Sequence, residues 1–277
     1  MPSYVPLQPP IVKPQSDALY SYQEFTPSKE LRPYVACYWS SVTHAAIPAG
    51  VHRVVPDGCV DIIVDLQAST HAKAVFIAGF MTSSMTVSLP AHQSMFGIRF
   101  YLDHAHRFMR GPVSTFVSKQ VYLEDSWGRD AALMVDAVTA ARGMKDRLTQ
   151  VEQILKNCVT ATDSQVNVLQ ASMAYIYERK GVLTVRELAD QACYSERHVR
   201  RAFMQQYGIS PKEVHNIVRF QFVLRDMYQR SSVSFADVAV KFGYYDQSHL
   251  NQHFKRYYGM PPRQVFVLPR DREGSGD

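Results

Sequence analysis

The second half of this 277-residue chain contains an internal repeat, and the repeat constrains the fold more than any other feature of the sequence. Glu187-Leu188-Ala189 matches Asp237-Val238-Ala239 at an offset of 50 residues. After one inserted residue the offset becomes 51, and apolar residues, glycines and prolines recur in the same order: Val199 with Leu250, Phe203 with Phe254, Tyr207-Gly208 with Tyr258-Gly259, and Pro211 with Pro262. Two segments that repeat these positions are expected to build the same supersecondary unit.

Capping signals indicate that this unit is a pair of short helices joined by a tight turn. In the first copy Thr184-Val185-Arg186-Glu187 is a capping box, Ser195 caps a second helix and Gly208 ends it. The corresponding residues of the second copy are Ser234, Asp246 and Gly259. The pattern is typical of a helix-turn-helix motif, so we expect two motifs, over 184–208 and 234–259.

A longer helix is predicted between the two copies. Ser210-Pro211-Lys212-Glu213 reads as a full capping box with proline at the first helical position, and the helix should run to about Arg230. About 18 residues would make a rod of roughly 27 Å. Two second helices held apart by such a rod would suit major-groove segments about one DNA turn, ~34 Å, apart.

The non-core faces of the two second helices carry side chains that suit base edges. Arginine matches guanine O6 and N7, asparagine and glutamine match adenine N6 and N7, and serine suits a base or a phosphate. The candidate DNA-binding residues are Arg197, Arg200, Arg201, Gln247, Ser248, His249, Asn251, Gln252 and Lys255. A plain helical bundle is the alternative, but its solvated faces would more often mix glutamate and lysine.

Charge is distributed unevenly along the chain. The net charge is +5, with residues 1–164 neutral and residues 165–270 carrying 15 Lys/Arg against 8 Asp/Glu. A neutral half joined to a basic half is expected where one domain meets a polyanion, although solvated surface charge would look the same. The cations expected on phosphates are Arg179, Arg219, Lys241, Lys255 and Arg256.

The first half has a different pattern. Seven prolines in residues 1–33 predict an extended arm, and short β-branched and aromatic runs between 34 and 100 predict an antiparallel sandwich or barrel followed by helices. Pro48-Ala49-Gly50 is expected to be a turn between strands. The fold class is therefore α+β, with a sensing or dimerisation domain over 34–160 and an all-α DNA-binding domain over 165–270, the boundary lying at 160–165.

Compartment and chemistry follow from what the sequence lacks. No apolar run approaches the ~18 residues of a membrane span, and the N-terminus has no signal-peptide pattern, so we expect a cytoplasmic protein without membrane contact. Four cysteines without a CxxC pair are expected to be reduced thiols rather than a disulfide framework or zinc site. No cofactor, metal or catalytic residue is predicted.

The repeat resembles a known family at particular residues. Residues 194–203 with Gly208-Ile209-Ser210-Pro211, and residues 242–250 with 254–262, look like the two motifs of the AraC/XylS family of bacterial transcription regulators. The resemblance covers about 165–267 and implies that the candidate residues contact bases and phosphates. It also implies a β-rich, often cupin-like N-terminal domain that senses an effector or dimerises. Cys193 stands where glycine is frequent in the family, and Val214 and Val265 stand where tyrosine is frequent.

The N-terminal domain offers a weaker functional signal. Trp39, Arg53, Asp61 and Arg99 fall in predicted strands and are candidates for an effector pocket in which arginine would meet an anionic ligand. A structural Arg–Asp pair is the alternative. His104 and His106 point to different faces of a predicted helix, which argues against a metal site.

These observations together predict a sequence-specific transcription regulator that binds double-stranded DNA and is modulated by a small-molecule effector or by homodimerisation. RNA polymerase would be a further partner if the protein is an activator. Two alternatives remain: a constitutive DNA-binding protein whose first domain only makes protein contacts, and an enzyme joined to a DNA-targeting module.

Overall fold

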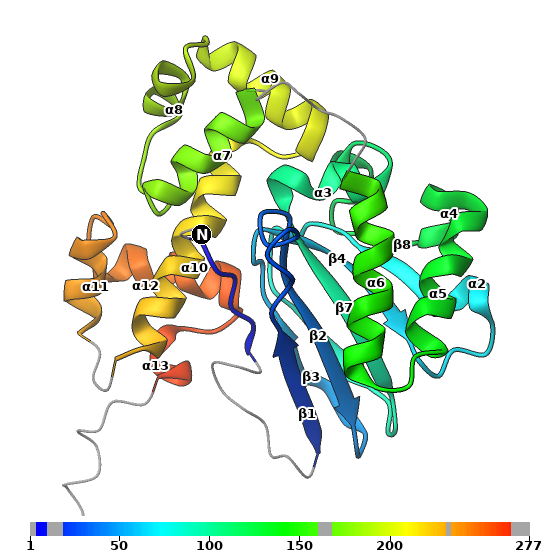
Figure 1. Cartoon of the computed structure of the whole chain (residues 1–277). Coiled ribbons are helices and arrows are strands. Elements are labelled where there is room, and N and C mark those ends of the chain that lie inside the picture. The colour runs from blue at the N-terminus through cyan, green and yellow to red at the C-terminus, as the bar shows by residue number, and fades with distance from the viewer. Residues whose placement is uncertain (1–3, 10–18, 160–167, 231–233, 267–277) are drawn as a thin grey trace, which may run out of the picture.

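The computed structural model of the chain describes residues 4–9, 19–159, 168–230 and 234–266. They form an N-terminal α/β domain and a C-terminal helical domain, which lie against each other (Figure 1). The α+β class predicted from the sequence is confirmed. The expected boundary at 160–165 lies outside the described residues.

The N-terminal domain is built on two antiparallel sheets. One has six strands in the order β1-β2-β7-β4-β5-β8, and the other pairs β3 with β6. The strands are β1 Tyr20–Phe25, β2 Val35–Thr43, β3 Ile47–Val54, β4 Cys59–Asp65, β5 Val75–Ala78, β6 Met85–Leu89, β7 Ser94–Tyr101 and β8 Gln120–Tyr122. The central strands bury Val60, Ile62 and Ile98 completely, because these positions alternate toward the core.

Helices cover this sheet, and most of them follow residue 101, where the sequence predicted a helical region. They are α2 His71–Ala74, α3 Leu102–Met109, η1 Val113–Phe116, α4 Leu123–Trp127, η2 Gly128–Asp130, α5 Ala131–Thr139 and α6 Met144–Val159. Helix α2, which precedes β5, and strand β8 were not predicted. Leu155 of α6 and Val138 of α5 are fully buried. The apolar stripes of these helices therefore close the N-terminal core on one side of the sheet (Figure 1).

Two expectations for this domain are wrong. The segment 1–33 is not an extended arm throughout, because Tyr20–Phe25 pairs with β2 along its whole length and Tyr4 is buried. Pro48-Ala49-Gly50 lies inside β3, where the register with β6 shifts between Ile47 and His52, and does not form a turn between strands. A bulge accommodates residues that otherwise favour turns.

The C-terminal domain packs its helices around one long central helix. Its helices are α7 Val168–Glu178, α8 Val185–Ala192, α9 Glu196–Tyr207, α10 Pro211–Tyr228, α11 Phe235–Lys241, α12 Gln247–Tyr258 and α13 Pro262–Val265. The central helix α10 buries Ile217, Val218 and Phe220 completely. It thus supports a helix pair at each of its ends (Figure 1).

Candidate DNA-binding face and effector cavity

The first helix-turn-helix unit consists of α8 and α9. Cys193 ends α8 with φ 58°, a backbone conformation that favours glycine. The side chain of Ser195 accepts a hydrogen bond from His198 N and so caps α9, and Gly208 ends that helix with φ 71°. Phe203 is fully buried against the core. The face of α9 opposite Phe203 is consequently turned to solvent.

That outer face of α9 is cationic. Arg197, Arg200 and Arg201 are all exposed. Arg200 Nη2 lies 3.0 Å from Glu196 Oε2, and both side chains are about half exposed. An exposed ion pair within one helix turn contributes little to stability and exchanges readily with water. The guanidinium of Arg200 is therefore free to move onto a guanine edge or a phosphate.

The second unit, α11 and α12, repeats this construction with a different turn. Asp246 Oδ1 accepts a hydrogen bond of 2.7 Å from His249 N and caps α12, and Gly259 ends the helix with φ 87°. The left-handed position after α11 is occupied by Gly243, with φ 65°. Phe254 is fully buried, as Phe203 is in the first unit. Both units thus hold their second helix by a cap, a buried aromatic ring and a glycine stop.

The outer face of α12 presents amides and hydroxyls instead of guanidinium groups. Ser248, His249, Gln252 and Lys255 are exposed, whereas Gln247 and Asn251 are half-buried. The Oδ1 atom of Asn251 is enclosed and has no hydrogen-bond partner among the described residues. An unpaired amide oxygen costs free energy unless another molecule donates to it. Because the oxygen is closed off from solvent, the Asn251 side chain has to turn outward before it can accept from an adenine N6 donor.

The linker helix α10 is fastened to α12 by one carboxylate. Glu213 accepts hydrogen bonds from Arg256 Nη2, at 2.8 and 2.9 Å, and from Tyr257 OH at 2.9 Å. The full capping box predicted at residues 210–213 is therefore only half formed: Ser210 Oγ accepts from Glu213 N, but the Glu213 side chain binds α12 instead of the cap. This contact fixes the second reading helix on the rod that separates the two units.

Not every cation predicted on phosphates is placed for that role. Arg219 lies over the ring of Tyr244, with Cζ 3.6 Å from its centroid, and is half-buried, so the expectation that it binds phosphate is wrong for this conformation. Lys241 forms an ion pair with Asp226. Arg179 and Lys255 are exposed, and neither forms a salt bridge among the described residues.

The four candidate effector residues line one cavity of about 390 Å³ between the two sheets: Trp39 from β2, Arg53 from β3, Asp61 from β4 and Arg99 from β7. A volume of this order holds a small metabolite. Asp61 and Arg99 are opposite each other in the β4–β7 register. Trp39 Nε1 donates to Asp61 Oδ2 at 2.8 Å.

Arg99 is already surrounded by carboxylates. Its guanidinium lies 3.2 Å from Asp61, 3.1 Å from Asp57 and 3.4 Å from Glu24. Burial raises the pKa of Asp61 to about 6; Arg99 opposes that rise and Asp57 adds to it. The structural Arg–Asp pair considered from the sequence is present, and each nitrogen of the guanidinium already contacts a carboxylate.

Comparison with known proteins supports the interpretation of the C-terminal half. Residues 188–266 match a family described as a helix-turn-helix domain. A segment of 78 residues is 31% identical to the HTH-type transcriptional activator RhaS of Escherichia coli (strain K12 / DH10B), covering 28% of each chain. The two matches support an AraC-type helix-turn-helix domain over residues 188–266. The resemblance to the AraC/XylS family predicted from the sequence is thereby confirmed for this domain.

Beyond the AraC-type domain the comparisons are less specific. Residues 23–122 match a family described as a domain of unknown function (DUF6597). Among solved structures, apo ToxT from Vibrio cholerae is similar at a TM-score of 0.43 and 10% identity, over 90% of this chain and 97% of that one. CdpR from Pseudomonas aeruginosa gives a TM-score of 0.32 and 15% identity, over 64% of this chain and 46% of that one.

Both reading helices of the AraC-type domain end against the N-terminal domain. Ser114 Oγ donates to Gln205 O near the end of α9, at 2.9 Å. Arg53 Nη1 donates to Tyr258 O at the end of α12, at 3.0 Å. Because Arg53 also lines the cavity, one side chain joins the cavity to the end of α12.

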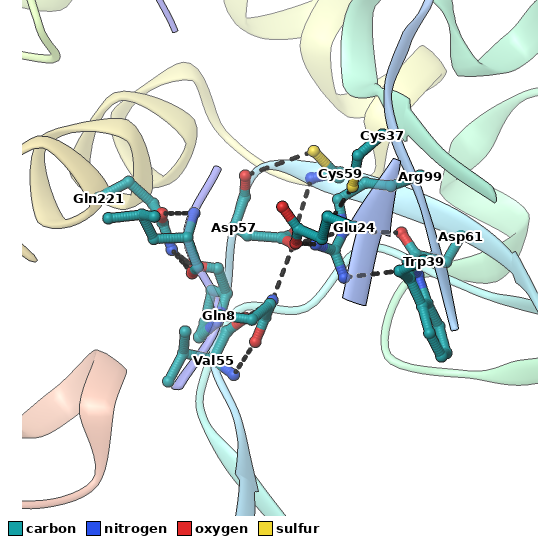
Figure 2. Close-up of polar contacts among 12 residues, drawn as sticks. Gln8, Glu24, Cys37, Trp39, Val55, Asp57, Cys59, Asp61, Arg99 and Gln221 are labelled. Carbon is teal, nitrogen blue, oxygen red and sulfur yellow. Dashed lines mark hydrogen bonds and ion pairs between the residues drawn. The ribbon is translucent and has the colours of Figure 1, made fainter. Parts of the chain in front are cut away.

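The N-terminal residues 4–9 make a second link to the AraC-type domain. Gln221 of α10 accepts from Leu7 N at 2.7 Å and donates to Leu7 O at 3.2 Å (Figure 2). On the other side Gln8 Nε2 donates to Asp57 Oδ2 at 2.7 Å. Tyr4 stacks on Tyr177 with ring centroids 4.6 Å apart. Residues 4–9 therefore lie between the Arg99 cluster and the linker helix.

Several residues of the cavity could not be assigned from the sequence. Tyr20 and Tyr22 line it, and Glu24 contacts Arg99, yet all three lie in the segment expected to be an arm. The alternation of tyrosines in residues 20–25 was the available signal, because period-two aromatic residues are typical of a strand.

Two features are absent from the described part of the chain. It contains no group of three or more histidine, cysteine, aspartate or glutamate side chains that could hold a metal ion. None of its helices combines the length and apolar character needed to cross a bilayer.

Proposed function

We propose that this protein is a sequence-specific DNA-binding transcription regulator in which α9 and α12 read neighbouring major-groove segments. The observation that carries the proposal is the pair of helix-turn-helix units, each exposing base-reading side chains, joined by an 18-residue helix. That helix is roughly 27 Å long, close to the spacing of successive major-groove segments.

The proposal assigns base and phosphate contacts to particular residues. They are Arg197, Arg200 and Arg201 of the first unit and Gln247, Ser248, His249, Asn251, Gln252 and Lys255 of the second. Phosphate neutralisation should supply much of the affinity. With roughly five to eight phosphate contacts, log K should fall against log salt with a slope of about −4 to −7.

The cavity of the N-terminal domain is proposed as the site of an effector that modulates DNA binding. Arg53 supports this role because it lines the cavity and also donates to the last turn of α12. A ligand that moved Arg53 would alter the restraint on the second reading helix, and the two binding sites would be coupled. The protein would act in the cytoplasm without catalysis. It would contact RNA polymerase if it is an activator, and the N-terminal domain would supply the contact if it is a homodimer.

A constitutive DNA-binding protein is the second candidate, favoured by the paired state of Arg99, which already has three carboxylate neighbours. The two candidates differ in whether ligands change DNA affinity. An electrophoretic shift assay of the full chain on its selected site, with and without ligand, distinguishes them.

Selection of bound sequences from a random DNA pool tests the main proposal. The full chain should enrich sites with two preferred segments about one helical turn apart. Arg200→Ala should relax the preference at one base pair and cost about 1–3 kcal/mol on the selected site. Absence of enrichment, or an equal loss on selected and random DNA, would contradict base reading by Arg200.

A further inference from the structure

One wall of the cavity is a row of aromatic rings. His52 lies 5.0 Å from Tyr20, Tyr20 lies 6.5 Å from Tyr22, and Tyr22 lies 6.0 Å from Trp39, all measured between ring centroids. All four side chains line the cavity. The faces of such rings attract cations through their quadrupoles, tryptophan most strongly.

At its Trp39 end, the aromatic row lies beside a cluster with more negative than positive groups. Around Trp39 and Tyr22, three carboxylates (Asp57, Asp61 and Glu24) meet a single guanidinium, that of Arg99. Tyr22 OH donates to Glu24 Oε1 at 2.7 Å, so the aromatic row and the carboxylate cluster are joined directly.

The second cation of the lining does not neutralise this cluster. Arg53 directs Nη1 to Tyr258 O and places its guanidinium over the Tyr258 ring, with Cζ 5.9 Å from the centroid. Its charge therefore faces the carbonyl end of α12, where the helix dipole is negative. The carboxylate cluster keeps an unmatched negative charge.

The cavity also contains a polar group without a partner. His52 is only 7% exposed, and its Nδ1 atom forms no hydrogen bond with any described residue. Burial lowers the pKa of His52, so the ring is neutral at pH 7. The unpaired Nδ1 atom is itself enclosed, so the part of His52 that a bound molecule meets is the neutral ring lining the cavity.

We propose that this cavity binds a small organic cation, an amine or quaternary ammonium group carried on an apolar body. The charged group would lie on the Trp39 and Tyr22 rings beside Asp61, which lines the cavity. Glu24 would act from one contact further out, through Tyr22 and Arg99. The apolar body would lie along the remaining lining, which includes Ile63, Phe76, Met85, Val87 and Met95. At the other end the body would contact the neutral ring of His52.

This assignment replaces the anionic ligand expected from the sequence. A carboxylate or phosphate placed at Arg99 would meet three negative groups at once, with the guanidinium already occupied. Incomplete compensation is visible in Asp61: burial raises its pKa to about 6 even though Arg99 lies in contact. A second cation in the cavity would relieve that cost.

Calorimetric titration of the full chain with three probes of similar size tests the ligand class. The probes are benzyltrimethylammonium, phenylacetate and benzyl alcohol, which differ in charge but share one aromatic ring. We expect saturable binding of the cation at least about tenfold tighter than binding of either other probe. Tighter or equal binding of phenylacetate, or no saturable binding of benzyltrimethylammonium, would overturn the proposal.

Glu24→Gln provides a matched variant, because the amide keeps the side-chain shape and removes one charge. It should weaken binding of benzyltrimethylammonium by about three- to tenfold. Glu30→Gln is the control and should leave binding unchanged. Glu30 pairs with Lys156, whereas Glu24 contacts Tyr22 and Arg99, which line the cavity. If Glu24→Gln binds the cation as tightly as wild type does, the carboxylate cluster does not contribute to cation binding.

The inference rests on the proposed function only for what the ligand would do, because binding itself is measured without DNA. Failure of the titration with intact DNA selection would overturn the ligand class alone. Failure of DNA selection with cation binding intact would overturn the proposed regulator alone.

Discussion

The two helix-turn-helix units share one backbone plan but differ in the chemistry of their second helices. Helix α9 exposes three arginines, whereas α12 exposes a hydroxyl, amides and a single lysine on the corresponding face. Their interiors differ as well. A half-buried aspartate, Asp103 of α3, lies beside Tyr207 of the first unit, and a half-buried histidine, His253, lies in the second.

This difference indicates a division of roles between the units. Guanidinium groups contribute charge and guanine contacts, so the first unit should supply most of the salt-dependent affinity. Amides contribute hydrogen bonds without charge, so the second should supply discrimination at adenines. The repeat preserves the scaffold while allowing the two reading surfaces to diverge.

The largest expected effect tests whether the two scaffolds are equivalent. Phe203→Ala and Phe254→Ala each empty a fully buried ring position at corresponding places in the repeat. Each should lower the free energy of unfolding by about 3–5 kcal/mol. Urea denaturation followed by circular dichroism measures both, and a loss below about 1 kcal/mol in either variant would show that its unit is not held by this ring.

The contributions of Asp103 and His253 to the stability of the fold should change with pH in opposite directions. Burial raises the pKa of Asp103 to about 7, so its protonated form stabilises the fold at low pH, and that stability is lost as the pH rises from about 4 to 7. Burial lowers the pKa of His253 to about 3, so its stability is complete above about pH 6.5 and is lost as the pH falls from there.

Denaturation of Asp103→Asn and His253→Phe at several pH values separates these two contributions. Relative to Asp103→Asn, wild type should lose up to about 1.4 kcal/mol per pH unit as the pH rises. Relative to His253→Phe, wild type should lose stability as the pH falls. For each variant, the difference in unfolding free energy from wild type is plotted against pH. Slopes of the same sign for Asp103→Asn and His253→Phe would contradict the assignment of the two groups.

DNA binding should separate the two reading faces. Arg200→Ala and Asn251→Ala should each weaken binding to the selected site by about 1–3 kcal/mol. Only the arginine variant should also reduce the salt dependence, because only it removes a charge. Arg129→Ala, which alters an exposed cation of the N-terminal domain, is the control and should bind as wild type does. Identical salt slopes for the two variants would argue against the division of roles.

The smallest effect concerns the two turns. Cys193 adopts φ 58° with a side chain, whereas Gly243 adopts φ 65° without one. Cys193→Gly should therefore raise stability by about 0.5–1 kcal/mol, and Gly243→Ala should lower it by a similar amount or more. A Cβ atom at Gly243 would lie 3.0 Å from Val182 Cγ1, which adds to that cost. Thermal denaturation checks both, and a lower melting temperature in Cys193→Gly would contradict the strain.

Local signals made the C-terminal domain predictable from its sequence. The caps Ser195 and Asp246 and the stops Gly208 and Gly259 act within one helical turn, so their residue types are sufficient to locate the helices. The exception was Glu213, whose side chain joins Arg256 on another helix instead of closing the local box. Because Arg256 is distant in the sequence, no local pattern around Glu213 could predict this pairing.

The cavity was harder to predict because strand pairing is non-local. Asp61 and Arg99 could be named as candidates, but their contact depends on the β4–β7 register. Glu24 was missed because its strand lies in a proline-rich segment, and it reaches Arg99 only after β1 pairs with β2. The charge balance of the site, and with it the ligand class, follows only from these pairings.

The central claim is that a rigid helix holds two reading helices in neighbouring grooves of one duplex. Insertion of about five base pairs, half a helical turn, between the two selected segments tests it most directly. The account predicts that affinity falls at least about tenfold, because α10 cannot follow the rotation of the second segment. Equal affinity for the two spacings would show that the units do not bind as one rigid pair.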